Sequence, residues 1–205
     1  MYHLFIISGP GGGGKDSIID RVLLNKELNL VKLVSHTTRN KRVGEREEKD
    51  YYFLTREEFE REIAKKQMLE YEVMESNHHY YGTHKKQLLD KLNSHNVICK
   101  KMPIGALKLA EYFPAQAVTI FIDANDLELK NRLLATDRSI EHSLINRRLE
   151  QAIHERSLKN QFQYQINNHD GDLEKTVLEV DKIIRSNIFD SLTKPVKIGK
   201  ISNNV

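Results

Sequence analysis

Residues 4–17 of this chain, LFIISGPGGGGKDS, decide its fold, because they join an apolar strand pattern to a glycine-rich loop. A helical pattern of apolar residues follows at Ile18, Ile19, Val22 and Leu23. Strand, glycine loop and helix in this order are typical of a P-loop, whose backbone N–H groups surround an anionic phosphate. The stretch therefore predicts a site for the phosphates of a nucleoside triphosphate.

One position of this loop departs from the pattern G-x-x-x-x-G-K-S/T, because Asp16 stands where a hydroxyl residue normally binds Mg²⁺. A carboxylate about 4 Å from a phosphate would repel it by roughly 1 kcal/mol in water, and bound magnesium would turn that repulsion into coordination. Asp16 is therefore either a magnesium ligand or an outward-facing acid at a helix N-terminus. The predicted triphosphate contacts are Gly9, Gly11, Gly12, Gly13, Gly14, Lys15, Asp16 and Ser17.

The composition limits the kinds of partner. The length of 205 residues suits one α/β domain with an inserted subdomain. The net charge of +3 is spread along the chain, so small anionic nucleotides are expected as partners and nucleic acid is not. The single cysteine, Cys99, excludes an internal disulfide and fits a reducing cytoplasm. No apolar run reaches the ~20 residues of a membrane span, and the sequence leaves open a monomer or a homodimer.

Strand and helix patterns alternate along the chain, which predicts an α/β fold with a doubly wound parallel sheet. The predicted strands are residues 3–8, 30–34, 97–101, 118–122 and 164–167, and the predicted helices are 15–25, 104–112, 126–134, 143–160 and 172–188. Between them an inserted α+β subdomain is predicted, with strands at 51–54 and 68–74, a helix at 55–66, and a turn at 80–83 before a helix at 84–93. The predicted boundaries are 1–34 and 84–190 for the core, about 135–146 for a lid, 35–83 for the inserted subdomain and 191–205 for a C-terminal tail.

A second pattern lies in the inserted segment. It reads Ser35-x-Thr37-Thr38-Arg39-x-x-Arg42-x-Gly44-Glu45, followed by Asp50-Tyr51-x-Phe53. Further along the chain come Glu70, Tyr80-Tyr81-Gly82-Thr83, Arg147-Arg148-Leu149 and Ile166-Asn167-Asn168. Together with the phosphate loop, these motifs closely resemble the guanylate kinase family over residues 3 to about 188. The resemblance implies a P-loop nucleoside monophosphate kinase that uses ATP and Mg²⁺ to phosphorylate GMP or dGMP.

The resemblance assigns the acceptor nucleotide to the inserted segment. Two guanidinium groups and two phenols make a suitable cage for a dianionic phosphate, and the family implies this role for Arg39, Arg42, Tyr51 and Tyr81. The carboxylate of Glu70 would accept from guanine N1–H and the exocyclic amine, while hydroxyl groups would bond to O6. The remaining implied GMP contacts are Ser35, Thr83 and Glu45, of which Glu45 either supports the cage or binds the acceptor.

The polar segment at about 135–146 resembles a kinase lid. Arginines of such a lid stabilise charge on the transferring phosphoryl group after closure. Arg138 and Arg148 align best with this role. The predicted catalytic residues are therefore Lys15, Arg39, Arg138 and Arg148.

Three other residues near these motifs have two interpretations each. Arg132 and Arg147 also flank the lid, and we interpret them as surface arginines of helices. Asn168 matches a family position near the adenine of ATP, and an asparagine is also typical of a turn after a strand.

The chain departs from the family pattern at the end of the third core strand. Family members carry Asp-x-Asp before a glycine there, whereas this chain has Lys100-Lys101-Met102, and Gly11 stands where serine is usual. One hypothesis is that Asp16 restores a magnesium ligand lost at Lys100 and Met102, while Lys100 contacts an anionic group. Two alternatives to a GMP kinase follow: a related kinase with a different phosphorylated acceptor, and a weakly active or inactive phosphate-binding module. Retention of Lys15 argues against the module.

Overall fold

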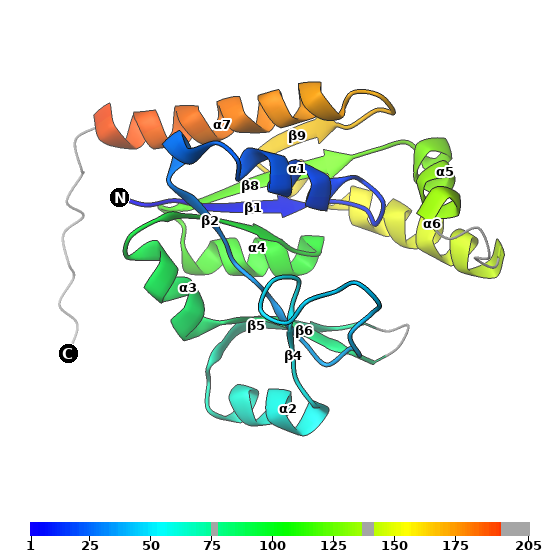
Figure 1. The fold of residues 1–205 in the computed structure, drawn as a ribbon, viewed down its shortest axis with the longest axis horizontal. Coiled ribbons are helices and arrows are strands. Elements are labelled where there is room, and N and C mark those ends of the chain that lie inside the picture. The colour runs from blue at the N-terminus through cyan, green and yellow to red at the C-terminus, as the bar shows by residue number, and fades with distance from the viewer. Residues whose placement is uncertain (75–77, 137–141, 194–205) are drawn as a thin grey trace.

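The computed structural model describes residues 1–74, 78–136 and 142–193, which form two β-sheets (Figure 1). The larger sheet has five parallel strands in the order β2-β7-β1-β8-β9. Their bounds are Leu30–Lys32 for β2, Asn96–Lys100 for β7, Leu4–Ser8 for β1, Ala117–Asp123 for β8 and Tyr164–Asn167 for β9. Because β1 and β7 are parallel neighbours, the phosphate loop after β1 and the residues after β7 meet at the same edge.

Helices cover both faces of this sheet (Figure 1). The helices of one face are α1 (Lys15–Val22) and α7 (Leu173–Thr193), and those of the other are α3 (Lys85–Leu92) and α4 (Pro103–Tyr112). Along β1, Phe5 and Ile7 pack in the cluster with α1 and α7, whereas Leu4 and Ile6 pack with α3 and α4. Both faces are apolar, which explains the near-continuous apolar strands. The predicted doubly wound α/β fold is confirmed.

The smaller sheet is built from the middle of the chain and has the order β4-β3-β6-β5. Its strands are β3 (His36–Thr37), β4 (Tyr52–Phe53), β5 (Met68–Val73) and β6 (Tyr80–His84), with helix α2 (Arg56–Ala64) beside them. The predicted capping box of α2 is present, since Thr55 accepts from the backbone N–H of Glu58 and Glu58 accepts from that of Thr55. All four strands lie within or at the edge of the segment predicted as an insertion.

The turn predicted at 80–83 is wrong, because these residues form strand β6 between β3 and β5. Gly82 suggested a turn, yet it is needed where the strand crosses Phe59. A Cβ at Gly82 would lie 2.9 Å from Cζ of Phe59 and 2.9 Å from the carbonyl oxygen of Glu70. Close packing, rather than turn geometry, therefore explains this glycine.

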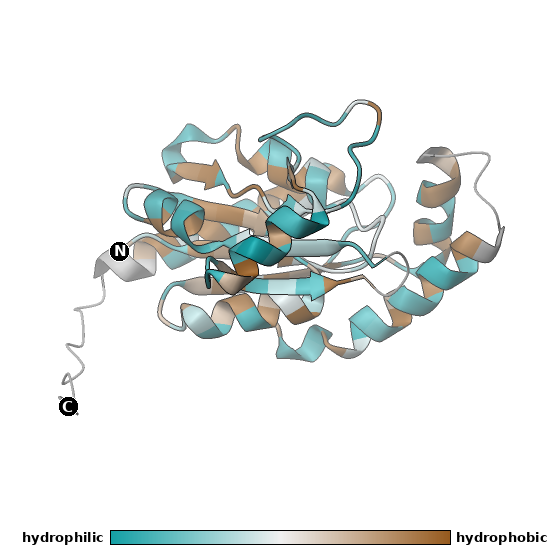
Figure 2. Cartoon of the chain, turned by 90° about the horizontal axis from the view of Figure 1, so that it is seen from below, coloured by the Kyte–Doolittle hydropathy of each residue, from teal (hydrophilic) through white to brown (hydrophobic). Residues whose placement is uncertain are grey.

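Helices α5 (Asp126–Thr136) and α6 (His142–Ser157) extend beyond the carboxyl ends of the core strands (Figure 1). Both helices show mixed hydrophilic and hydrophobic colouring (Figure 2), and Leu149 and Ala152 of α6 pack with Leu129 of α5. Two helices are shorter than predicted and are followed by 3-10 turns, η1 (Lys26–Leu28) and η2 (Lys159–Gln161). None of the helices in the described ranges has the length and apolarity to cross a membrane.

Candidate active site

The phosphate loop joins β1 to α1 and needs glycine where a side chain would collide. Gly9 has φ of +127°, and a Cβ there would lie 1.9 Å from the carbonyl oxygen of Ile122. Gly14 has φ of +88°, and a Cβ there would lie 2.4 Å from Nδ2 of Asn168. The loop is therefore fitted closely against β8 and against the residue that follows β9.

Lys15 begins α1 and folds its side chain back over the loop. Its Nζ donates to the carbonyl oxygens of Gly9 at 2.6 Å and Pro10 at 2.7 Å. Burial lowers the pKa of Lys15 to about 8, against the opposing field of the Glu155 carboxylate. Glu155 lies buried on α6, and burial raises its pKa. Sequence reasoning missed Glu155, because no motif marks a glutamate in that helix.

Asp16 forms an ion pair with the end of β7. Both of its carboxylate oxygens lie 2.7 Å from Nζ of Lys100, although the two residues are 84 positions apart. Burial opposes ionisation of Asp16, but the charge and hydrogen bond of Lys100, together with the charges of Lys32 and Lys15, outweigh burial and lower the pKa of the carboxyl group. Two departures from the family pattern thus lie face to face and compensate each other's charge.

The hypothesis that Asp16 binds magnesium stays a prediction. Within the described ranges, no three His, Cys, Asp or Glu side chains come together in a way that suits a metal ion. Nucleotide-bound magnesium usually takes one or two carboxylates together with waters and phosphate oxygens. Asp16 fits that arrangement as a single oxygen ligand, provided that Lys100 releases it.

Tyr51 continues the contacts from Lys100 into the predicted phosphate cage. Nζ of Lys100 lies 5.9 Å from the centroid of the Tyr51 ring, and Cζ of Arg39 lies 5.3 Å from the same centroid. The ring of Tyr81 meets that of Tyr51 edge-on, with centroids 5.8 Å apart. The structure therefore brings together three of the four predicted cage residues and places Lys100 beside them.

Arg39 is held in place by Glu45. The two side chains form a bidentate pair, with Nη1–Oε2 at 2.8 Å and Nη2–Oε1 at 2.6 Å. This hydrogen bonding raises the pKa of Arg39 and lowers that of Glu45. The fourth cage residue, Arg42, reaches the pair only through its backbone N–H, which donates to Glu45 at 2.8 Å, while its side chain is exposed.

The three predicted base contacts meet in a buried polar cluster. Oγ1 of Thr83 donates to Oε1 of Glu70 at 2.6 Å. Nζ of Lys101 lies 2.9 Å from the same carboxylate oxygen and donates to Oγ of Ser35 at 2.9 Å. Lys101 was missed at the sequence level, because a lysine between Lys100 and Met102 belongs to no motif.

The interpretation of Arg132 as a surface arginine is wrong. Its guanidinium group donates to the carbonyl oxygens of Gly12 at 3.2 Å and Asn168 at 2.7 Å. The apolar periodicity of α5 could not reveal the contact between Arg132 and Gly12, because Gly12 lies outside the helix, in the phosphate loop. Asn168 also supports this loop, since its Nδ2 donates to the carbonyl oxygen of Gly13 at 2.9 Å. A position of Asn168 near adenine stays a prediction.

Only one of the two predicted lid arginines lies within the described residues. Arg138 lies outside the described residues. Arg148 is exposed on α6, so its catalytic role stays a prediction. The side chain of Arg147 is also exposed, in agreement with its interpretation as a surface arginine.

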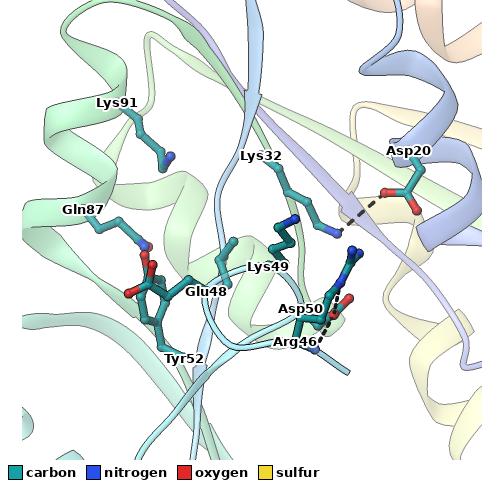
Figure 3. A pocket seen from close by; sticks show the side chains of 10 residues that line it. Asp20, Lys32, Arg46, Glu48, Lys49, Asp50, Tyr52, Gln87 and Lys91 are labelled. Carbon is teal, nitrogen blue, oxygen red and sulfur yellow. Dashed lines mark hydrogen bonds and ion pairs between the residues drawn. The ribbon is translucent and has the colours of Figure 1, made fainter. Parts of the chain in front are cut away.

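A separate cavity of about 350 Å³ lies between α1, α3 and the loop that precedes β4 (Figure 3). Its lining residues are Asp20, Lys32, Val34, Arg46, Glu48, Lys49, Asp50, Tyr52, Gln87 and Lys91. Nζ of Lys32 lies 3.7 Å from Oδ1 of Asp20, and Nε of Arg46 lies 3.9 Å from Oδ2 of Asp50. The lining includes none of the predicted nucleotide contacts, so the cavity is distinct from the candidate site.

The fold and these contacts define a P-loop protein in which Lys100, Tyr51 and Arg39 follow one another beside the phosphate loop. The guanylate kinase family model matches residues 1–187, and the chain belongs to this family.

Its relatives cover nearly the whole chain. A guanylate kinase of Prochlorococcus marinus is 36% identical over 187 residues, covering 91% of this chain and 98% of the relative. One of Mesomycoplasma hyopneumoniae is 37% identical over 198 residues, covering 92% and 96%. A crystal structure of guanylate kinase from Anaplasma phagocytophilum has a TM-score of 0.72 at 29% identity, covering 90% of this chain and 85% of that one.

Proposed function

We propose that this protein transfers the γ-phosphoryl group of ATP to GMP or dGMP. A phosphate oxygen of the acceptor attacks the γ-phosphorus, the bond to the β-phosphate oxygen breaks, and ADP leaves with GDP or dGDP as the second product. The observation that supports this most strongly is the series of contacts from the phosphate loop through Asp16, Lys100 and Tyr51 to Arg39. These contacts support a donor site and an acceptor site that lie next to each other.

On the donor side, the phosphate loop and Lys15 bind the triphosphate. Lys15 exchanges the carbonyl oxygens of Gly9 and Pro10 for the outer phosphates, with the backbone N–H groups of the loop and α1 around them. With a pKa of about 8, Lys15 is mostly cationic at neutral pH. When bound, Mg²⁺ supplies positive charge to the triphosphate oxygens.

On the acceptor side, Glu45 fixes the plane of the Arg39 guanidinium, and Tyr51 and Tyr81 lie against it. This arrangement suits the phosphate of GMP. Glu70 and Thr83 lie further into the smaller sheet and suit the guanine base. Catalysis then consists mainly of positioning and charge stabilisation.

Lys100 lies between the two proposed sites and pairs with Asp16. The oxygens of a bound phosphate compete with the Asp16 carboxylate for this ammonium group. We infer that Lys100 follows the phosphate, which frees Asp16 for magnesium. Arg138 and Arg148 then add charge from the lid, and closure of residues 35–83 over the core excludes water.

The proposed reaction also bears on the oligomeric state and the cellular location of the protein. Both a monomer and a homodimer are compatible with this reaction. The free, buried Cys99 fits a reducing cytoplasm.

A coupled assay of ADP release tests the proposal. Purified protein is given ATP and Mg²⁺ with GMP, dGMP, AMP, UMP or CMP in turn, and turnover is expected with GMP and dGMP. Turnover with AMP, UMP or CMP, but with neither GMP nor dGMP, would show that the acceptor is a different nucleotide. Absence of turnover with every acceptor, together with tight GMP binding, would instead indicate a phosphate-binding module.

A further inference from the structure

Lys101 is a buried lysine whose backbone is fixed by β1. Its N–H donates to the carbonyl oxygen of Ile7 at 3.0 Å, and its own carbonyl oxygen accepts from Oγ of Ser8 at 2.9 Å. Its side chain is only 6% exposed and points away from the phosphate loop, toward β5 and β6 of the smaller sheet. Lys100, one residue earlier, pairs with the phosphate loop instead. Two adjacent lysines thus serve different parts of the site.

The ammonium group of Lys101 contacts two of the three predicted base contacts directly and reaches the third through one of them. It lies 2.9 Å from Oε1 of Glu70 and 2.9 Å from Oγ of Ser35. Oε1 of Glu70 also accepts from Thr83 at 2.6 Å. Lys101 therefore lies at the centre of the predicted base pocket.

Hydrogen-bonding capacity remains in this cluster. A lysine ammonium carries three N–H donors, and two of those of Lys101 are used by Glu70 and Ser35. Both contacts of Glu70 in this cluster, from Thr83 and from Lys101, fall on Oε1, and neither involves the second carboxylate oxygen, Oε2. One strong donor and one strong acceptor therefore remain for a ligand.

The packing around the cluster keeps these groups close together. A Cβ at Gly105 of α4 would lie 2.9 Å from Oε2 of Glu70 and 3.2 Å from Oε1 of Glu72. Glycine therefore lets the helix approach both carboxylates without displacing them. Burial and the neighbouring Glu70 raise the pKa of Glu72, so the cation of Lys101 also balances acidic charge at this place.

We propose that Lys101 is a specificity-determining residue of the acceptor pocket, whose ammonium group donates to O6 of guanine while Glu70 accepts from N1–H and the exocyclic amine. This inference rests on the proposed function, because it assumes that the acceptor base enters beside Glu70. The spare donor and the spare acceptor match the edge of guanine. Adenine would present an amine to the ammonium group and an unprotonated N1 to the carboxylate, so both contacts would be lost.

The test compares two ligands that differ only at position 6. GMP and 6-thio-GMP share N1–H and the exocyclic amine, but sulfur is a weaker hydrogen-bond acceptor than oxygen. Their dissociation constants are measured by calorimetry on the wild type, on Lys101→Met and on Lys182→Met, an exposed lysine of α7 that serves as the matched control.

We expect the wild type and Lys182→Met to prefer GMP by about tenfold, as for a hydrogen bond to a charged donor. Lys101→Met should bind both ligands within about twofold of each other. The ratio of the two constants is independent of the folded fraction, because both are measured on the same preparation. An unchanged ratio in Lys101→Met would overturn the inference and leave Lys101 as a partner of Glu70 alone.

Loss of the Lys101 cation leaves two acidic groups together, so the comparison is repeated in a Glu72→Gln background, which removes one of them. The same loss of preference is expected when Lys101→Met is added to that background. Failure of the wild type to bind GMP would count against the proposed function. Wild-type GMP binding with no effect of Lys101→Met on the preference would count against this inference only.

Discussion

The phosphate loop and the end of β7 lie side by side at one edge of the core sheet, yet they differ from the family pattern in different ways. The loop keeps its glycines, and Gly9 and Gly14 show why, since a Cβ at either position would collide. At the end of β7, Lys100 and Met102 stand where the family pattern has acidic residues. Backbone geometry thus constrains the loop strictly, whereas the charge of Lys100 at the end of β7 is balanced by Asp16.

The largest effect is expected from removing the loop lysine. Lys15→Met deletes the cation beside the outer phosphates, and kcat should fall by about 10²–10³-fold, as when a preorganised charge-stabilising group is lost. Steady-state kinetics with GMP and ATP measure this. Lys26→Met, on the exposed turn after α1, is the control and should keep wild-type rates. A fall of less than about tenfold would mean that the loop does not hold the transferring phosphate.

The second prediction breaks the charge pairing between the two regions. Lys100→Asp places a second carboxylate next to Asp16, and like charges at about 4 Å cost roughly 1–4 kcal/mol near a surface. The melting temperature should therefore fall. Adding Asp16→Ser should restore most of it, because the repulsion disappears. If Lys100→Asp lowered the melting temperature equally in the Asp16→Ser and wild-type backgrounds, residues 16 and 100 would not be coupled.

The third prediction concerns pH. In the proposed reaction ATP binds the protonated form of Lys15, whose pKa is lowered to about 8 by burial. ATP affinity should therefore be constant below pH 8 and weaken above it, by up to about tenfold per pH unit. Titration calorimetry from pH 6.5 to 9.5 checks this. Lys15→Met should bind ATP weakly with little change over the same range, and an identical slope in that variant would assign the titration to another group.

The smallest effect is expected from Asp16→Ser, which restores the usual hydroxyl. If Asp16 becomes a magnesium ligand after Lys100 leaves it, the magnesium concentration for half-maximal rate should shift several-fold. Binding of ATP to the variant with and without Mg²⁺ gives a second measurement. Unchanged magnesium dependence in both would show that Asp16 serves only as the partner of Lys100.

Local patterns predicted most of the fold. Alternating strands and helices, with apolar residues on both faces, gave the parallel sheet and its covering helices, and the glycine loop gave its own position between β1 and α1. Strand β3 was missed and β6 was predicted as a turn. Strand β3 has only two residues in a polar segment, and Gly82 of β6 is explained by contact with Phe59. Such features depend on neighbours that are distant in the sequence.

The candidate site likewise contains residues that local motifs predicted and residues that only packing reveals. Arg39, Tyr51, Tyr81 and Thr83 were predicted because they belong to motifs of several residues, and Glu70 was predicted because of its place between those motifs. Lys101, Glu155 and the contact of Arg132 with the phosphate loop were not, because each depends on an element packed against it.

By itself, the sequence determined that a triphosphate-binding loop and an acceptor signature occur in one α/β chain, since both are encoded in consecutive residues. Only the tertiary structure decided what Asp16 and the two lysines do. Parallel pairing of β1 with β7 brings Lys100 to Asp16 and directs Lys101 to Glu70. The physical reason is that an ion pair depends on distance in space, and residues 84 positions apart share no local pattern that could reveal it.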